Sequence, residues 1–270
     1  MHLADLCERL DDRLRTADFA DLDASANGLQ VGPARARTRD DIDGTDGIEG
    51  KSVEHVAFAV DAAVETTERA AEAGAELLVT HHGLVWGGLS RITGREYRRI
   101  AALVENDLAL YVSHLPLDAH PTLGNAAGLA DLLDLGDREP FGALGPEHIG
   151  TRGTAHEAFS PSDLATVLDR ELDTGAQDVR VLDFGPEEIA EVAIVTGSGV
   201  DWLDEAVDAG ADALVTGEGK QQVYYEAKEA GIHVFLAGHY ATETFGVRSL
   251  AVLADEWGIE TTVLDAPTGL

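Results

Sequence analysis

The fold is decided by the stretch VEHVAFAVDAAVETTERAAEAGAELLVTHHG, residues 53–83, and by its counterpart IAEVAIVTGSGVDWLDEAVDAGADALVTGEG, residues 189–219. Each stretch has the pattern of a strand, a turn, an amphipathic helix that stops at Ala-Gly-Ala, and a second strand. A βαβ unit of this kind favours two parallel strands joined by a right-handed crossover. The sequence therefore predicts an α/β fold built from two related halves.

The likeness continues beyond these units. A helix and a further strand follow each of them, and each of these strands ends in a histidine, His114 or His239, with a carboxylate four residues later, Asp118 or Glu243. Sites in α/β sheets collect at the carboxyl ends of the strands. We therefore expect two α/β halves with mixed sheets and a metal site at the strand ends between them.

The domain division follows the duplication. Residues 1–130 form the expected N-terminal α/β half, and residues 131–270 hold a middle segment and the C-terminal half, whose last part packs back on the first half. The middle segment, residues 136–188, reads as strand, helix and strand. Residues 34–52 have almost no apolar side chains and predict an exposed acidic loop.

Composition excludes several classes of function. The 270 residues include 50 acidic and 19 basic ones, for a net charge of −31. A field of that sign repels nucleic acid and anionic membranes, and suits a halophilic protein in a high-salt cytosol. There is no apolar run of about 18 residues to cross a membrane and no signal peptide, so a cytoplasmic location is expected. The single cysteine, Cys7, excludes internal disulfides and multi-thiolate metal sites.

The strand ends carry a set of donors suited to metal ions. The first half adds two adjacent histidines, where the second half has Gly217 and Glu218. One histidine at a strand end is usually a hydrogen-bonded structural residue, but four of them with two spaced acids favour a metal centre. Imidazole and carboxylate suit zinc, iron, manganese, nickel or cobalt, and six donors are enough for two ions. The donors are His81, His82, His114, Asp118, His239 and Glu243.

The two adjacent histidines raise a geometric question, because neighbouring strand residues point to opposite faces. Either the strand ends before His81, or His81 and His82 reach different ions. We predict one ion for each. The glycines of Trp-Gly-Gly and Thr-Gly-Ser-Gly could also cradle a phosphate, although a plain strand-to-helix turn explains the second motif equally well.

The motifs NGLQVG, THHGLVWGG, SHLPLDAHPTLGNAAGLA, VTGSG, VTGEGK and AGHYATETFGV together resemble the Nif-three-like family of dinuclear-metal-centre proteins, also called GTP cyclohydrolase I type-two homologues. The resemblance runs from about residue 3 to residue 267. It implies a two-part α/β subunit, a toroidal hexamer and a two-metal centre. The ligands that it implies are His81, His82, Asp118, His239 and Glu243, with His114 as a ligand or close neighbour.

The resemblance also implies a metal-dependent hydrolase that acts on a small heterocyclic or phosphorylated compound, as in hydrolytic opening of the guanine ring of GTP. His114 or Glu218 would then serve as general acid or base where it is not a ligand. An anionic substrate needs basic groups nearby, for which Arg91, Arg95 and Lys220 are the candidates. The alternative is a non-enzymatic, metal-carrying or regulatory ring.

The charge generates a prediction about salt. Because acids outnumber bases 50 to 19, self-repulsion should weaken the fold or its assembly at low ionic strength. We expect the melting temperature, measured by scanning calorimetry, to rise between about 0.1 and about 2 M salt, a range over which screening becomes short-ranged. A flat profile would contradict this expectation.

Overall fold

The computed structural model describes residues 1–32, 51–175 and 177–270. The chain divides into unit 1, residues 1–117 and 247–266, and unit 2, residues 118–246 and 267–270. The division expected from the sequence lay at residue 130, whereas the chain enters unit 2 after Leu117 and returns to unit 1 at Val247. The expected acidic loop at residues 34–52 lies, except for its last two residues, outside the described part.

Unit 1 contains a mixed five-stranded sheet in the order β1-β4-β3-β2-β11. Strands β2, β3, β4 and β11 are parallel, and β1 pairs antiparallel with β4 at one edge. The strands are β1 (Gly28–Val31), β2 (His55–Asp61), β3 (Leu77–His82), β4 (Ala109–Val112) and β11 (Glu260–Val263). The helical elements that begin in this unit are α1 (Leu3–Leu14), η1 (Thr16–Phe19), α2 (Val64–Glu72), α3 (Arg95–Glu105) and α4 (Leu115–Asp118).

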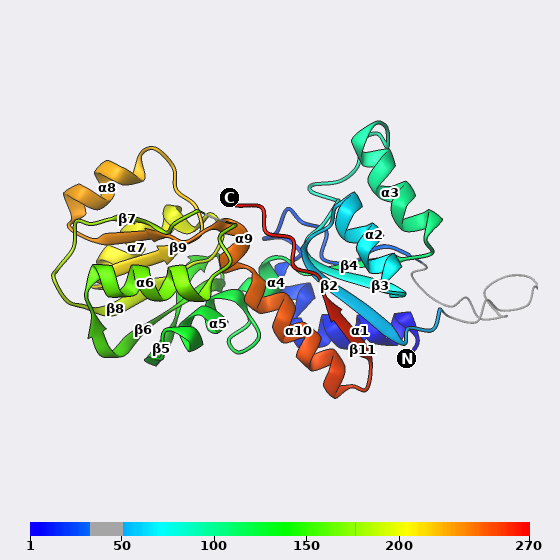
Figure 1. Ribbon diagram of the computed structural model, residues 1–270, viewed down its shortest axis with the longest axis horizontal. Coiled ribbons are helices and arrows are strands. Elements are labelled where there is room, and N and C mark those ends of the chain that lie inside the picture. Colours follow the sequence, from blue (N-terminus) through cyan, green and yellow to red (C-terminus); the bar gives the residue numbers. More distant parts are fainter. Residues whose placement is uncertain (33–50, 176) are drawn as a thin grey trace, which may run out of the picture. The chain divides into compact units, whose positions relative to one another are not determined.

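Helices cover both faces of the unit 1 sheet (Figure 1). On one face, Ala57 of β2 and Leu78 of β3 share an apolar cluster with Ala70 of α2 and Leu103 of α3. On the other face, Tyr111 of β4 reaches α1, where its hydroxyl donates a hydrogen bond of 2.8 Å to Asp11. Both faces of the parallel strands are therefore buried, which explains their nearly continuous apolar sequence.

Unit 2 contains a mixed six-stranded sheet in the order β5-β6-β8-β9-β10-β7. Strands β8, β9 and β10 are parallel, and β5, β6 and β7 pair antiparallel with their neighbours. The strands are β5 (Leu135–Leu144), β6 (Glu147–Phe159), β7 (Arg180–Leu182), β8 (Ile189–Ile194), β9 (Ala213–Thr216) and β10 (His233–Leu236). The helical elements are α5 (Asn125–Leu132), α6 (Pro161–Glu171), η2 (Gly199–Trp202), α7 (Leu203–Asp208), α8 (Val223–Ala230), α9 (His239–Thr242) and α10 (Thr244–Glu256), which continues into unit 1.

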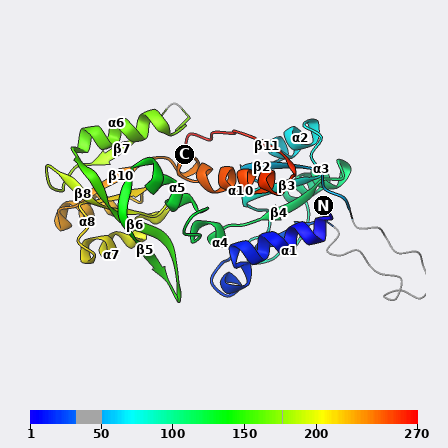
Figure 2. The ribbon, with the colours of Figure 1, turned by 90° about the horizontal axis from the view of Figure 1, so that it is seen from below.

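The middle segment forms the antiparallel part of this sheet and one of its covering helices. Helix α6 begins where the sequence predicts, because the Ser160 hydroxyl accepts a 3.1 Å hydrogen bond from the N–H of Asp163 and Pro161 takes the first helical position. Its Leu164 and Leu168 join the core of unit 2. Helices α7 and α8 lie on the opposite face of the sheet from α6 (Figure 2).

The predicted duplication is confirmed in the topology. The series β2-α2-β3-α3-β4 of unit 1 corresponds to β8-α7-β9-α8-β10 of unit 2, and all neighbouring strands in both series are parallel. The prediction of two related α/β halves with mixed sheets is therefore correct. Within the described residues, no helix has the length and apolar character needed to cross a bilayer.

Candidate metal centre

Unit 1 brings three of the predicted donors together at the carboxyl edge of its sheet. His81 and His82 are the last residues of β3, and His114 lies just beyond β4. The ring centroid of His81 is 4.7 Å from that of His82 and 5.0 Å from that of His114. One nitrogen from each ring lies within 4.8 Å of the others, so the three could hold one metal ion.

This arrangement differs from the expectation for adjacent strand residues. Strand β3 continues through His82, yet the two rings stay close instead of pointing apart. Each ring leans toward a different neighbouring strand end, since His81 Nδ1 lies 3.0 Å from the Ser113 carbonyl and His82 Nδ1 lies 2.9 Å from Asp61 Oδ1. The assignment of one ion to each histidine stays a prediction.

The hydrogen bonds also determine the tautomers. The Ser113 carbonyl oxygen is only an acceptor, so His81 must carry its proton on Nδ1. The carboxylate of Asp61 imposes the same tautomer on a neutral His82. In this tautomer, Nε2 keeps the lone pair that a metal ion needs.

His114 is held in the same way by a residue far away in the sequence. Its Nδ1 lies 2.9 Å from Asp23 Oδ1, and its backbone N–H donates to Asn27 Oδ1 at 2.7 Å. Burial alone would raise the pKa of Asp23, but hydrogen bonds from His114 and Asn27 hold it below its usual value. Asp23 is therefore an ionised carboxylate in a largely buried position, suited to orienting the imidazole.

Unit 2 supplies a fourth histidine between two acids. His239, at the start of α9, places Nδ1 3.1 Å from Glu218 Oε1 and Nε2 3.2 Å from Glu243 Oε2. Burial lowers the pKa of His239, but the two carboxylates outweigh it and raise the pKa to about 9. A hydrogen bond from Ser198 is the main cause of the lowered pKa of Glu218. The space between His239 Nε2 and Glu243 thus favours a positive charge.

The two predicted acidic ligands lie together in unit 2. Asp118 and Glu243 are 8% and 3% exposed, and they have oxygens within 4.8 Å of each other. Asn125, which is fully buried, donates from Nδ2 to Asp118 Oδ1 at 2.8 Å and accepts from the Gly246 N–H at 2.7 Å. Two carboxylates buried this closely repel each other, and a divalent cation would relieve that repulsion.

Gly197 leaves space beside Glu243 and His239 because it has no side chain. Its φ is +60°, a conformation that favours glycine. A Cβ atom at this position would lie 2.3 Å from Glu243 Oε1 and 3.1 Å from His239 Nε2. The turn after β8 therefore leaves the donor set accessible because it has no side chain. The residues present fit a metal ion by donor chemistry, by charge and by space.

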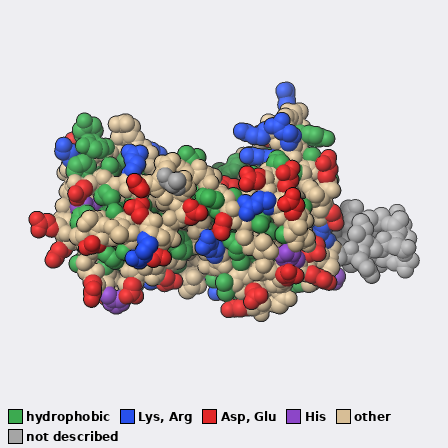
Figure 3. Space-filling view, viewed as in Figure 1, with side chains coloured by type: hydrophobic (Ala, Val, Ile, Leu, Met, Phe, Trp, Pro, Cys, Tyr) green, Lys and Arg blue, Asp and Glu red, His purple; other side chains and the backbone are tan. Residues whose placement is uncertain are grey.

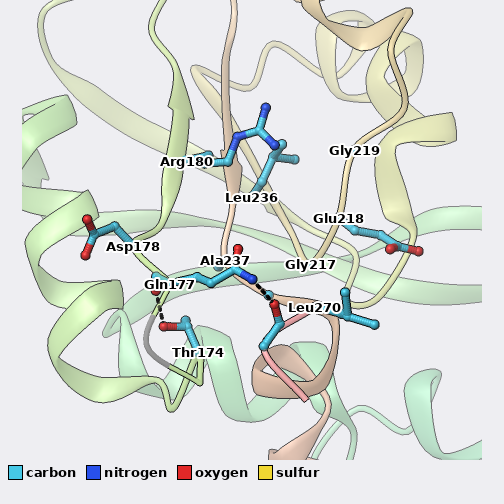
Figure 4. A pocket seen from close by; sticks show the side chains of 12 residues that line it. Thr174, Gln177, Asp178, Arg180, Gly217, Glu218, Gly219, Leu236, Ala237 and Leu270 are labelled. Atoms are coloured by element: carbon cyan, nitrogen blue, oxygen red, sulfur yellow. Dashed lines mark hydrogen bonds between the residues drawn. The ribbon is translucent and has the colours of Figure 1, made fainter. Parts of the chain in front are cut away.

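A pocket in unit 2 lies along the ends of the parallel strands and is lined in part by Glu218, the partner of His239 (Figure 4). Arg180 is at one end of the pocket and Thr174 at the other, with Glu218 to one side. Its lining consists of Thr174, Gln177, Asp178, Arg180, Gly217, Glu218, Gly219, Leu236, Ala237, Gly238, Gly269 and Leu270. Small molecules could therefore approach this part of the donor set. Lys220, an expected basic group, is instead paired with Asp201.

Sequence reasoning found the donors and missed the residues that orient them, Asp23, Asp61 and Asn125. A signal for Asp61 was present, because it ends β2 as His82 ends the next strand, and the two are direct partners in the pairing. Asp23 lies in an irregular segment, and nothing in the sequence relates it to His114. Asn125 lies on α5, where it has the appearance of a helix-start residue.

Fold and donor sets define a class of protein: a two-sheet α/β protein with clustered histidine and carboxylate side chains that could hold a metal ion. The chain belongs to the Duf34/NIF3 (NGG1p interacting factor 3) family, whose profile matches residues 1–268. The family resemblance drawn from the motifs is thus confirmed.

Relatives and solved structures agree with this membership. Proteins named GTP cyclohydrolase 1 type 2 homolog from Halobacterium salinarum and Archaeoglobus fulgidus are 55% and 40% identical, each over 100% of both chains. The solved protein ybgI, whose function is given as unknown, is 31% identical with a TM-score of 0.86, and TTHA1606 from Thermus thermophilus is 35% identical with a TM-score of 0.84. Both structures cover 100% of this chain and are themselves covered completely.

The orienting role of Asp61 generates a prediction. Its carboxylate lies 2.9 Å from His82 Nδ1, so Asp61→Ala should free the His82 ring and lower metal affinity about 10- to 100-fold, the usual effect of losing such a partner. Titration calorimetry with zinc measures the affinity. Exposed Glu68 provides the control, because Glu68→Ala removes the same charge from the same unit. Equal affinities of both variants would contradict the role of Asp61.

Proposed function

We propose that this protein binds two divalent metal ions and is a metal-dependent hydrolase of small heterocyclic or phosphorylated compounds, similar to a GTP cyclohydrolase. The proposed ligands are His81, His82, Asp118, His239 and Glu243, and the ions are zinc, iron, manganese, nickel or cobalt. Assembly into a toroidal homo-hexamer in the cytoplasm is part of the same proposal, on the strength of the family resemblance.

The observation that carries the proposal is shared by the four histidines. Each places Nδ1 within hydrogen-bonding distance of an oxygen, which belongs to Ser113, Asp61, Asp23 or Glu218. This is the arrangement by which proteins orient metal-binding imidazoles and make Nε2 the ligand atom. Three of these histidines are proposed ligands and the fourth is His114, and their shared orientation supports a metal centre.

Ligand number supports a catalytic centre over a structural one. Structural sites are usually closed by four protein ligands, whereas five or six donors shared by two ions leave positions for water and substrate. When bound, such ions act as Lewis acids and lower the pKa of a coordinated water toward 7. The buried carboxylate of Glu243 lies between Asp118 and His239, which suits a ligand shared by both ions.

His114 is the proposed catalytic residue. Asp23 accepts the Nδ1 proton of its ring, which leaves Nε2 able to take up a proton from a reacting group and return it. Glu218, the other candidate, is already hydrogen-bonded to Ser198 and paired with His239. We therefore assign Glu218 the task of orienting His239.

The test is hydrolysis of a substrate panel that includes GTP, other nucleotides and simple phosphoesters by the metal-loaded protein. His82→Ala should lower the rate at least about 100-fold, since it removes a ligand whose loss disturbs the reacting ion. His148→Ala is the matched control, because His148 is exposed on β6. Equal rates for wild type and His82→Ala would contradict the hydrolase proposal. The alternative function, a non-enzymatic metal-carrying or regulatory ring, would then be favoured.

Metal stoichiometry tests the assignment of ligands. If His81 and His82 serve different ions, His81→Ala and His82→Ala should each retain about one ion per chain, and the double variant should retain none. Glu243→Ala should lower the total as well, because a shared carboxylate serves both ions. Plasma mass spectrometry on protein purified without an affinity tag gives the counts. If either single change empties both sites, cooperative assembly around the shared carboxylate replaces the model of one histidine per ion.

A further inference from the structure

The aromatic ring of Trp86 lies beside the histidines of unit 1 without being buried among them. Its centroid is 5.0 Å from that of His114, with the rings nearly perpendicular, and 6.2 Å from that of His82. The residue is 44% exposed. A large apolar ring that is half exposed to solvent calls for an explanation when it contacts two candidate functional residues.

Hydrogen bonds hold this ring in place. Trp86 Nε1 donates to the Gly83 carbonyl at 3.1 Å, so the polar end of the side chain is satisfied within its own turn. The backbone on either side of Trp86 is paired with the segment 24–26, because Ala26 N–H donates to the Val85 carbonyl at 3.0 Å and Gly87 N–H donates to the Ala24 carbonyl at 2.7 Å.

The same two segments hold the neighbouring histidine. Asp23, which orients His114, directly precedes segment 24–26, and Asn27, which accepts from the His114 backbone, directly follows it. The ring of Trp86 and the imidazole of His114 are thus positioned by one short piece of chain. A preorganised aromatic surface of this kind can bind a ligand with little loss of conformational entropy.

The chain that follows Trp86 has an unusual charge. Residues 84–99 contain four arginines and one acid, Glu96, which gives a charge of +3 (four minus one) in a protein of net charge −31. Basic side chains gather over α3 with apolar ones beside them (Figure 3). A local positive field in an otherwise acidic protein attracts anions. The arginines are Arg91, Arg95, Arg98 and Arg99.

We propose that Trp86 is a binding residue, on whose exposed ring face the planar heterocycle of an anionic small molecule stacks beside His82 and His114. The inference rests on the proposed function, since it names the class of ligand for the same centre. It concerns binding alone and involves no bond-breaking step.

Binding of guanosine monophosphate, a planar anionic probe, tests the proposal. Titration calorimetry on metal-loaded protein should give similar affinities for wild type and Trp86→Phe, which keeps an aromatic face. Trp86→Leu, which keeps apolar bulk without the π-face, should bind about ten-fold or more weakly, as expected for one base–aromatic stack. Tyr97→Leu is the control, because Tyr97 is a 59% exposed aromatic residue of the same charged stretch and should bind like wild type.

Four results would overturn the inference. Equal affinity of Trp86→Leu and wild type, or no binding of the probe to wild type, excludes stacking on this ring. Loss of metal ions from Trp86→Leu would show that Trp86 acts only by supporting the proposed ligand His82 beside it. Guanosine that binds as tightly as its monophosphate would exclude an anionic ligand. If the probe binds through Trp86 but no compound of the panel is hydrolysed, the proposed hydrolase activity is contradicted and the binding role of Trp86 is supported.

Discussion

The hydrogen bond from a histidine Nδ1 to an oxygen at a strand end is the interaction on which the candidate centre depends. In unit 1 it follows from strand register. His82 is paired with Asp61 across β2 and β3, and Ser113 N–H bonds to the Thr80 carbonyl, which brings the Ser113 carbonyl alongside His81. A shift of one residue would turn these side chains to the other face of the sheet and lose both bonds. The apolar core that fixes the register of β2, β3 and β4 therefore also fixes the tautomers of His81 and His82.

The duplicated units use the same backbone arrangement in different ways. His82 of the first unit corresponds to Glu218 of the second, and His81 corresponds to Gly217. A Cβ atom at Gly217 would lie 2.6 Å from His239 Cα, so no second histidine could be placed there without moving α9. The second unit thus has no histidine at this strand end, keeps the carboxylate of Glu218 beside His239, and places two other candidate donors, His239 and Glu243, on α9 and directly after it.

Local patterns made the donors and most elements predictable from the sequence. Residues close together in the sequence are enough to predict the elements of each repeat and the capped start of α6. They also predict that His114 and His239 lie at strand ends. The hydrogen-bond partners that orient the donors cannot be predicted from local patterns. Asp23 and His114 are 91 residues apart, and Asn125 and Gly246 are 121 apart. The boundary between the units was less predictable, because the repeat does not mark where the chain leaves unit 1, after Leu117. Residues 247–266 return to unit 1 because β11 adds to β2, as expected for a last part that packs back on the first half.

Charge in the interior of unit 2 argues for a cation more strongly than the acidity of the surface does. The two carboxylates have oxygens no more than 4.8 Å apart, and at that separation two full charges repel by about 3 kcal/mol at an effective dielectric constant of about 20. The neutral amide of Asn125 stabilises Asp118 without removing its charge, and the carboxylates of Glu243 and Glu218 raise the pKa of His239 to about 9 despite its burial. Unlike surface acids, which water and salt screen, Asp118 and Glu243 are buried and need a counter-charge at close range. A divalent ion provides twice the charge of the imidazolium proton in the same small space, which supports the proposal that these two carboxylates bind a metal ion.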